Sequence, residues 1–367
     1  MADFGNFPVK LIFPKLKSLD KCLELQILHL KIFICYTELF TSNLVLSKVI
    51  FLFDISFKFK EKVYKFHIML KKKNIVITGA LGQDGIILSK ILLKKKYNVF
   101  GIVKKLNFKQ VKNINYHKID LLDYKSVSSF LDKVNPISLI HLGTENPNYI
   151  ELKIKKDFYG KNLKASKNLI KYFSQHKVKK KLILVGTSQM YGTLEKVNLK
   201  SKFNPLNSYA RFRLESYKDM SKNKRKYNLN IVMAILFNHD SMYRKNKFLI
   251  PRLIKMIKSK NFKKLNEIYK QNISGDFSHA EDICNGLYKL IISKNNPDKL
   301  IFSSNIRTYV NDIIKFLLKK NNIKKNFTDS NLGYTSTPIG DNSFTKKTLK
   351  WNIKKDIFIA ANELNKL

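Results

Sequence analysis

Three glycines, each three residues after the last, follow a short apolar run toward the end of the first hundred residues. Residues 71–78 predict a buried strand, and residues 86–95 predict a helix directly after the glycines. In such a turn the first glycine permits a tight bend, the second lets the backbone approach a pyrophosphate, and the third lets the helix pack on the strand. The pattern predicts a dinucleotide-binding loop. Its candidate cofactor contacts are Gly79, Gly82, Gln83, Asp84 and Gly85.

The end of the next strand indicates which dinucleotide is bound. A strand over residues 97–103 leads into Lys104 and Lys105, where an NAD enzyme usually places an acid that holds the ribose hydroxyls. Two cations suit the 2′-phosphate of NADP, so we expect NADP rather than NAD. A solvated lysine pair is the alternative interpretation in so lysine-rich a chain.

Two further strands, over residues 115–119 and 137–142, end in short polar or glycine-containing loops. Their order after the glycine loop is the one that a doubly wound sheet requires. We therefore predict an α/β fold: a parallel Rossmann sheet over residues 70–236 and a smaller C-terminal α/β lobe over residues 237–367. The remaining predicted cofactor contacts at these strand ends are Asp120, Leu121, Leu142 and Gly143.

Several segments together resemble the GDP-mannose 4,6-dehydratase family of extended short-chain dehydrogenases, from residue 74 to about residue 292. The pair Gln83-Asp84 inside the glycine loop is more typical of that family than of the fold at large. The other segments that carry the resemblance are residues 101–103, 236–241, 278–282, 339–341 and 349–351. The resemblance implies a GDP-sugar substrate and an internal hydride transfer through NADP.

The resemblance also implies a set of catalytic residues, which this chain matches only in part. Thr187 and Tyr209 stand where the family has the Thr and Tyr that handle the C4 hydroxyl of the sugar. Gln189 stands at the position of the glutamate that acts on C5, and Arg213 stands at the position of a lysine that assists the tyrosine and, like it, contacts the cofactor. An amide does not take up a proton at a useful pH, so elimination loses its base. Arginine keeps the positive charge but not the compact ammonium.

Of the substrate contacts that the resemblance implies, some are present in this chain and others are replaced. Gly275 replaces an arginine of the family, and a second arginine falls at Thr335 or Thr337, so two cations that grip the diphosphate are missing. Lysines such as Lys245, Lys247 or Lys255 supply charge without bidentate geometry. The matching positions are Ser188, Asn238, Leu249 and Arg252.

Three functions remain open from the sequence. The first is GDP-mannose 4,6-dehydratase. The second is a nucleotide-sugar reductase or epimerase on the same scaffold, because hydride transfer at C4 needs Tyr209 and Thr187 but no acid at position 189. The third is a catalytically silent protein that keeps cofactor binding for another role.

The overall composition limits the kinds of partner that we expect this chain to bind. The formal charge of +43 arises from lysines spread along the whole chain, and only six residues are arginine, the side chain that nucleic-acid surfaces usually employ. We therefore expect no nucleic-acid partner.

Cys22, Cys35 and Cys284 lie far apart and form no metal-ligand spacing, which predicts a reduced, cytoplasmic setting and no metal. A homodimer or homotetramer is plausible for this fold.

Residues 1–69 form a doubtful extension before the first predicted strand. Charged residues interrupt their apolar stretch, so no uncharged run reaches the roughly 18 residues that a membrane helix needs. We expect Met69 to be the natural start and residues 1–68 to be upstream sequence. The alternative is a basic amphipathic segment that lies on an acidic membrane surface.

Overall fold

The computed structural model describes residues 73–106, 111–145, 158–176, 180–327 and 336–367. These residues belong to one compact unit, Lys72–Leu367. The expectations for residues 1–69, for Cys22 and Cys35 and for Thr335 lie outside the described residues. In the part of the chain that is described, no helix is long and apolar enough to cross a membrane.

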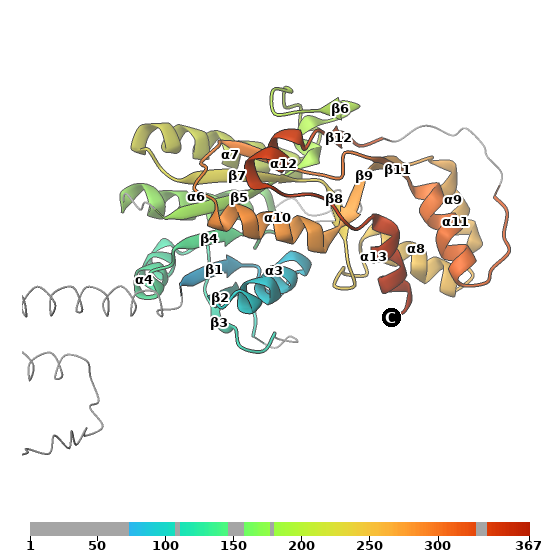
Figure 1. Cartoon of the computed structure of the whole chain (residues 1–367), viewed down its shortest axis with the longest axis horizontal. Helices are drawn as coiled ribbons and strands as arrows, with labels where there is room; N and C mark the ends of the chain where they lie inside the picture. The colour runs from blue at the N-terminus through green and yellow to red at the C-terminus, as the bar shows by residue number, and fades with distance from the viewer. Residues whose placement is uncertain (1–72, 107–110, 146–157, 177–179, 328–335) are drawn as a thin grey trace, which may run out of the picture. The chain divides into compact units, whose positions relative to one another are not determined.

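A parallel sheet of seven strands forms the centre of the unit, in the order β10-β7-β5-β4-β1-β2-β3 (Figure 1). Strand order reverses beside β1, which is the topological switch point where open α/β sheets bind ligands. The predicted Rossmann sheet is therefore confirmed. Its strands are β1 (Asn74–Thr78), β2 (Asn98–Val103), β3 (Asn115–Lys118), β4 (Ser138–His141), β5 (Lys181–Thr187), β7 (Ile231–Leu236) and β10 (Lys299–Phe302).

Helices cover both faces of this sheet because successive side chains of a strand point to opposite sides. Ile75 and Ile77 of β1 pack into a core cluster with α3 and α10, whereas Val76 packs into a second cluster with α4 and α6. Helix α7 lies along α6 (Figure 1). These helices are α3 (Gln83–Lys94), α4 (Tyr124–Val134), α6 (Phe158–Gln175), α7 (Ser208–Tyr227) and α10 (Ala280–Ile292).

A smaller lobe holds a second sheet and four helices with their own apolar core, as predicted (Figure 1). Strand β9 is the middle strand, parallel to β8 and antiparallel to β11. The sheet is made of β8 (Asn238–Asp240), β9 (Ser274–His279) and β11 (Arg307–Tyr309). The helices are α8 (Leu249–Lys258), α9 (Phe262–Lys270), α11 (Val310–Lys320) and α13 (Ile357–Asn365).

The expected boundary between residues 236 and 237 does not separate the two parts cleanly. Strand β10 lies in the large sheet beside β7, and α10 packs on α3, although both follow residue 237. Trp351 explains part of this return: its indole N–H donates to the Asp282 carbonyl at 2.8 Å, and its ring packs against Phe302 of β10. Burial of this apolar surface holds the chain's end against the Rossmann sheet.

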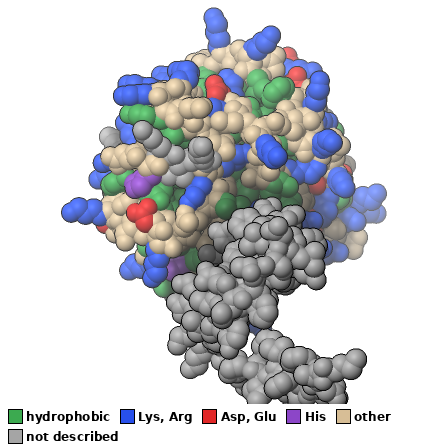
Figure 2. Space-filling view, turned by 60° about the vertical axis from the view of Figure 1, so that its left-hand side comes forward, with side chains coloured by type: hydrophobic (Ala, Val, Ile, Leu, Met, Phe, Trp, Pro, Cys, Tyr) green, Lys and Arg blue, Asp and Glu red, His purple; other side chains and the backbone are tan. Residues whose placement is uncertain are grey.

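Two short strands and one short helix complete the order of elements. Strand β6 (Lys196–Val197) pairs in parallel with β12 (Ile339–Gly340), and α12 (Ser343–Leu349) follows. Figure 2 shows Lys and Arg side chains distributed over the visible face rather than gathered in one patch. This distribution agrees with the scattered lysines of the sequence.

Candidate active site

The glycine loop has the geometry expected of a pyrophosphate cradle. Gly79 has φ +70°, and a Cβ there would lie 2.7 Å from the Cα of Gly143. A Cβ on Gly85 would lie 2.4 Å from the carbonyl oxygen of Gly79. Helix α3 begins at Gln83 with no side-chain cap, which leaves backbone N–H groups of its first turn available for an anion.

The ends of β1 and β4 are joined beside this loop. The Gly143 amide donates to the Thr78 hydroxyl oxygen at 2.8 Å, and that hydroxyl lies 2.8 Å from Nδ1 of His141. Burial and the nearby charge of Arg213 lower the pKa of His141 to about 3. His141 is therefore neutral, and it shares a hydrogen bond with Thr78 whose direction depends on which ring nitrogen carries the proton.

The other predicted cofactor residues lie at the strand ends around the loop. The ammonium of Lys104, after β2, is 2.8 Å from a carboxylate oxygen of Glu145, after β4. Asp120 accepts the backbone N–H of Leu122, so its carboxylate shapes its own turn. Asn162 of α6 both accepts from and donates to the backbone of Glu145 and thereby fixes the loop that follows β4.

Tyr209 and Arg213 lie one turn apart on α7, and their side chains touch. Nη2 of Arg213 donates to the Tyr209 phenol oxygen at 3.2 Å and to Thr144 Oγ1 at 2.7 Å. Nη1 of Arg213 donates to the carbonyl of Val185 at 2.5 Å, and the residue is 4% exposed. The arginine thus joins α7 to the ends of β4 and β5.

Thr187 ends β5, and Gln189 follows it in the short helix η1 (Ser188–Tyr191). The side-chain oxygen of Gln189 accepts from Asn207 Nδ2 at 2.9 Å, while Asn207 Oδ1 caps α7 by accepting from Ala210. The same Asn therefore orients Gln189 and begins the helix that carries Tyr209. An asparagine at the N-cap of a helix is a signal that the sequence already contained.

Two glutamates that lie near Gln189 and Tyr209 in the sequence form ion pairs with other residues. Glu195 is 3.6 Å from Arg307, and its side chain is 86% exposed. Glu215 pairs with Lys218 at 3.0 Å. The structure thus pairs each of these two acids with a cation.

On the substrate side, Asn238 begins β8, and its amide lies 3.5 Å from Thr337 Oγ1. A Cβ on Gly275 would lie only 2.0 Å from the same Thr337 oxygen. Gly275, where the family resemblance led us to expect one arginine, is therefore in contact with Thr337, one of the two threonines at which we expected the second. An arginine at position 275 requires Thr337 to move.

Arg252 of α8 borders a cavity of about 560 Å³ between α8 and α9. Lys255 and Lys264 also line it, together with polar groups such as Asn246 and Gln271. Leu249 lies on the first turn of α8, and Ser188 is buried beside Thr187. This cavity brings Arg252 together with two of the chain's many lysines.

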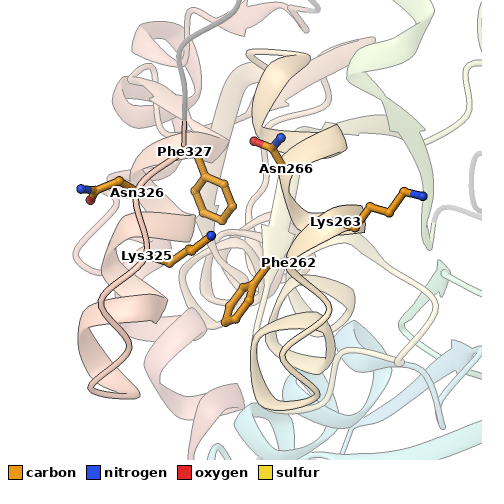
Figure 3. Close-up of a pocket in the computed structure, with 6 residues that line it drawn as sticks. All are labelled: Phe262, Lys263, Asn266, Lys325, Asn326 and Phe327. Carbon is orange, nitrogen blue, oxygen red and sulfur yellow. The ribbon is translucent and has the colours of Figure 1, made fainter.

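A second cavity, of about 330 Å³, lies between α9 and the segment after α11 (Figure 3). Lys325 points into it between Phe262 and Phe327, whereas Lys263 and Asn326 point away (Figure 3). None of the sequence-predicted site residues lines it. Across the described ranges, no cluster of three or more His, Cys, Asp or Glu side chains could hold a metal ion.

Curated relatives of this chain include GDP-mannose 4,6 dehydratases. The chain is 23% identical over 273 residues to a GDP-mannose 4,6 dehydratase of Dictyostelium discoideum, covering 68% of this chain and 76% of the relative. It is 25% identical over 268 residues to the human GDP-mannose 4,6 dehydratase, covering 64% and 69%.

Solved structures show the same fold at low identity. A UDP-glucose 4-epimerase of Thermotoga maritima superposes with a TM-score of 0.69 at 15% identity, over 80% of this chain and 97% of the epimerase. A dTDP-glucose 4,6-dehydratase of Bacillus anthracis gives a TM-score of 0.67 at 14% identity, over 80% and 96%. The model of the GDP-mannose 4,6 dehydratase family matches residues 76–355. Since that match spans most of the chain, the protein belongs to the GDP-mannose 4,6 dehydratase family.

Proposed function

We propose that the chain binds NADP at the glycine loop and converts GDP-mannose to its 4-keto-6-deoxy form at a low rate. The uncapped start of α3 suits a pyrophosphate. Gly79 and Gly85 allow the tight turn and the close packing that place this helix start beside the ends of the strands. Lys104 supplies a cation at the end of β2 for the 2′-phosphate, in exchange for its present partner Glu145. NAD, which lacks that phosphate, is the weaker ligand in this proposal.

The observation that carries the proposal is the contact between Arg213 and Tyr209. Tyr209 takes the proton of the C4 hydroxyl, and the buried guanidinium 3.2 Å away stabilises the phenolate that results. Thr187, at the end of β5, holds the same sugar hydroxyl. NADP⁺ held at the glycine loop would supply the acceptor for the C4 hydride and the donor of that hydride to C6.

The low rate follows from Gln189. Dehydration removes the C5 proton and the C6 hydroxyl as water, and a positioned base usually contributes about 10²–10⁴-fold to such a proton transfer. The Gln189 amide is held by Asn207 and cannot accept that proton. We therefore expect water to take it, with a correspondingly small kcat.

The sugar nucleotide lies, in this proposal, between the end of β5 and the lobe. Asn238 and Ser188 contact the sugar end, and Leu249 contacts the nucleotide. Arg252 holds negative charge together with Lys255, which shares its cavity. Lysines such as Lys255 thereby supply the positive charge of the arginines that are missing at Gly275 and at Thr335 or Thr337.

The same observation on Gln189 favours a second candidate, a nucleotide-sugar epimerase or reductase, since neither reaction needs an acid at this position. Product analysis separates the two. Incubation with GDP-mannose and NADP⁺, followed by proton NMR, should show a new C6 methyl doublet. A C4 epimer, or an alcohol formed from a keto sugar with NADPH, would instead identify the second candidate. No change in either sugar, with NADP bound, would leave a catalytically silent relative.

A further inference from the structure

Gln83 and Asp84 lie inside the glycine loop, between Gly82 and Gly85, yet their side chains reach the substrate lobe. Gln83 Nε2 donates to the carbonyl of His239 at 3.2 Å, and its Oε1 accepts from the Ser241 hydroxyl at 3.1 Å. Asp84 Oδ1 lies 3.0 Å from His239 Nε2. The first turn of α3 is thereby tied to β8 and to the residue that follows it, across more than 150 positions of sequence.

The hydrogen bonds of His239 define its charge. Nδ1 lies 2.6 Å from the carbonyl oxygen of Phe237, which only accepts, so Nδ1 carries a proton. Nε2 faces the Asp84 carboxylate, which accepts as well when it is ionised. Both ring nitrogens therefore donate, and the geometry is that of a buried imidazolium paired with a carboxylate.

The surrounding charges are consistent with this pair. Burial opposes the charged form of His239, but the charge and hydrogen bond of Asp84 outweigh it and raise the pKa above its ordinary value of 6.5. Burial likewise opposes ionisation of Asp84, yet the charge of His239 and hydrogen bonds from His239 and Gln83 lower its pKa to about 2. The other charged or titratable groups that face the pair are Asp240 and Arg244, which are bound to each other at 2.6 Å, and the buried thiol of Cys284, which lies 3.6 Å from the Asp84 carbonyl.

We propose that Gln83 and Asp84 are positioning residues that couple the dinucleotide loop to strand β8 through the Asp84–His239 ion pair. The proposal rests on the proposed function, in which the loop holds NADP and Asn238, at the start of β8, contacts the sugar. A ligand that orders the first turn of α3 also orders β8 and lowers the cost of binding the second ligand. By linkage, each ligand strengthens the other by the same factor.

The test measures affinities by calorimetry on the full chain: NADP⁺ with and without saturating GDP-mannose, and GDP-mannose with and without NADP⁺. For the natural chain at pH 6.5 we expect each ligand to tighten the other by about 5–150-fold. Asp84→Ala should bring that factor close to one. The factor is a ratio of two affinities of the same variant, so a change in the affinity for either ligand alone does not enter it. Asp123→Ala is the matched control, because this carboxylate caps α4 by accepting from Lys125 and Ser126 and has no contact with β8.

Asp84→Asn keeps the proposal testable if the alanine variant does not fold. An asparagine amide donates to Nε2 of a neutral His239, so the bridge persists without charge. In the natural chain the coupling should weaken as the pH rises through the pKa of His239, and in Asp84→Asn it should not change with pH. Equal coupling in the natural chain and Asp84→Ala, or the same pH profile in the natural chain and Asp84→Asn, would overturn the inference. Failure of either ligand to bind the natural chain would overturn the proposed function, and the coupling with it.

Discussion

The guanidinium of Arg213 donates to the phenol oxygen of Tyr209 at 3.2 Å, and the same nitrogen donates to Thr144 at 2.7 Å. One side chain thus binds the proposed catalytic tyrosine, the loop after β4 and the carbonyl of Val185 in β5. A lysine, with one nitrogen, reaches fewer of these partners. Arg213 is therefore both a structural link and the source of positive charge beside Tyr209.

Replacing Arg213 separates these two roles. Arg213→Met leaves the buried Val185 carbonyl without its donor and should reduce the free energy of unfolding by about 1–3 kcal/mol. It should also abolish turnover, since no charge remains beside Tyr209. Arg213→Lys should restore measurable turnover but not all of the lost stability. Denaturant unfolding and product formation, measured on both variants, check this; full activity of Arg213→Met would show that Tyr209 does not need the charge.

Gln189→Glu should raise the rate of dehydration by about 10²-fold, because a carboxylate supplies the missing base. The new side chain keeps its support, since Asn207 Nδ2 donates to a carboxylate as it does to the present amide oxygen. Gln189→Ala is the control and should show no gain. If neither Gln189→Glu nor the double variant with Arg213→Lys forms a keto sugar, the assignment of GDP-mannose as substrate is wrong.

An added methyl group should have opposite effects at Gly85 of the loop and at Gly160 of α6. Gly85→Ala places a Cβ 2.4 Å from the Gly79 carbonyl, so we expect a loss of stability of about 1–3 kcal/mol and at least about tenfold weaker NADP⁺ binding. Gly160→Ala, in α6, meets no atom within 4 Å and should stabilise the chain by about 0.5–1 kcal/mol. Thermal unfolding and NADP⁺ titration of both variants give the comparison. Unchanged NADP⁺ affinity in Gly85→Ala would place the cofactor elsewhere.

The lowered pKa of His141 predicts how the free energy of unfolding depends on pH. Its pKa is about 3 in the folded chain and 6.5 when unperturbed, so the unfolded chain binds the extra proton between these values. Stability therefore falls as the pH drops from about 6.5 toward 3, by on the order of 4 kcal/mol in total. His141→Asn, which still offers an acceptor to Thr78, should flatten this part of the profile. Melting temperatures at pH 4.5 and 7.5 measure the effect, and parallel profiles for the two proteins would show that another group is responsible.

Local sequence signals predicted much of the fold and part of the site. Gly79 needs its positive φ, and apolar runs of strand length needed burial on both faces, so the loop and the order of the first strands followed from the sequence. Contacts between positions far apart in the sequence could not be predicted in this way. Nothing near Asp84 identified His239 as its partner, and nothing near β10 predicted that it would return to the large sheet. In the sequence, Gly275 and the threonine at 335 or 337 were two independent replacements of an arginine. In the structure Gly275 lies against Thr337, so the two positions depend on each other.

In the proposed reaction a hydride moves within one GDP-mannose molecule, from C4 to C6, by way of NADP. Incubation of GDP-[4-²H]mannose with the full chain and NADP⁺ tests it most directly, with the product examined by deuterium NMR and absorbance at 340 nm. We expect deuterium in the C6 methyl group of a 4-keto sugar with no net NADPH, slowly in the natural chain and faster in Gln189→Glu. Deuterium that stays at C4 in both proteins, or that accumulates in NADPH, would contradict the account.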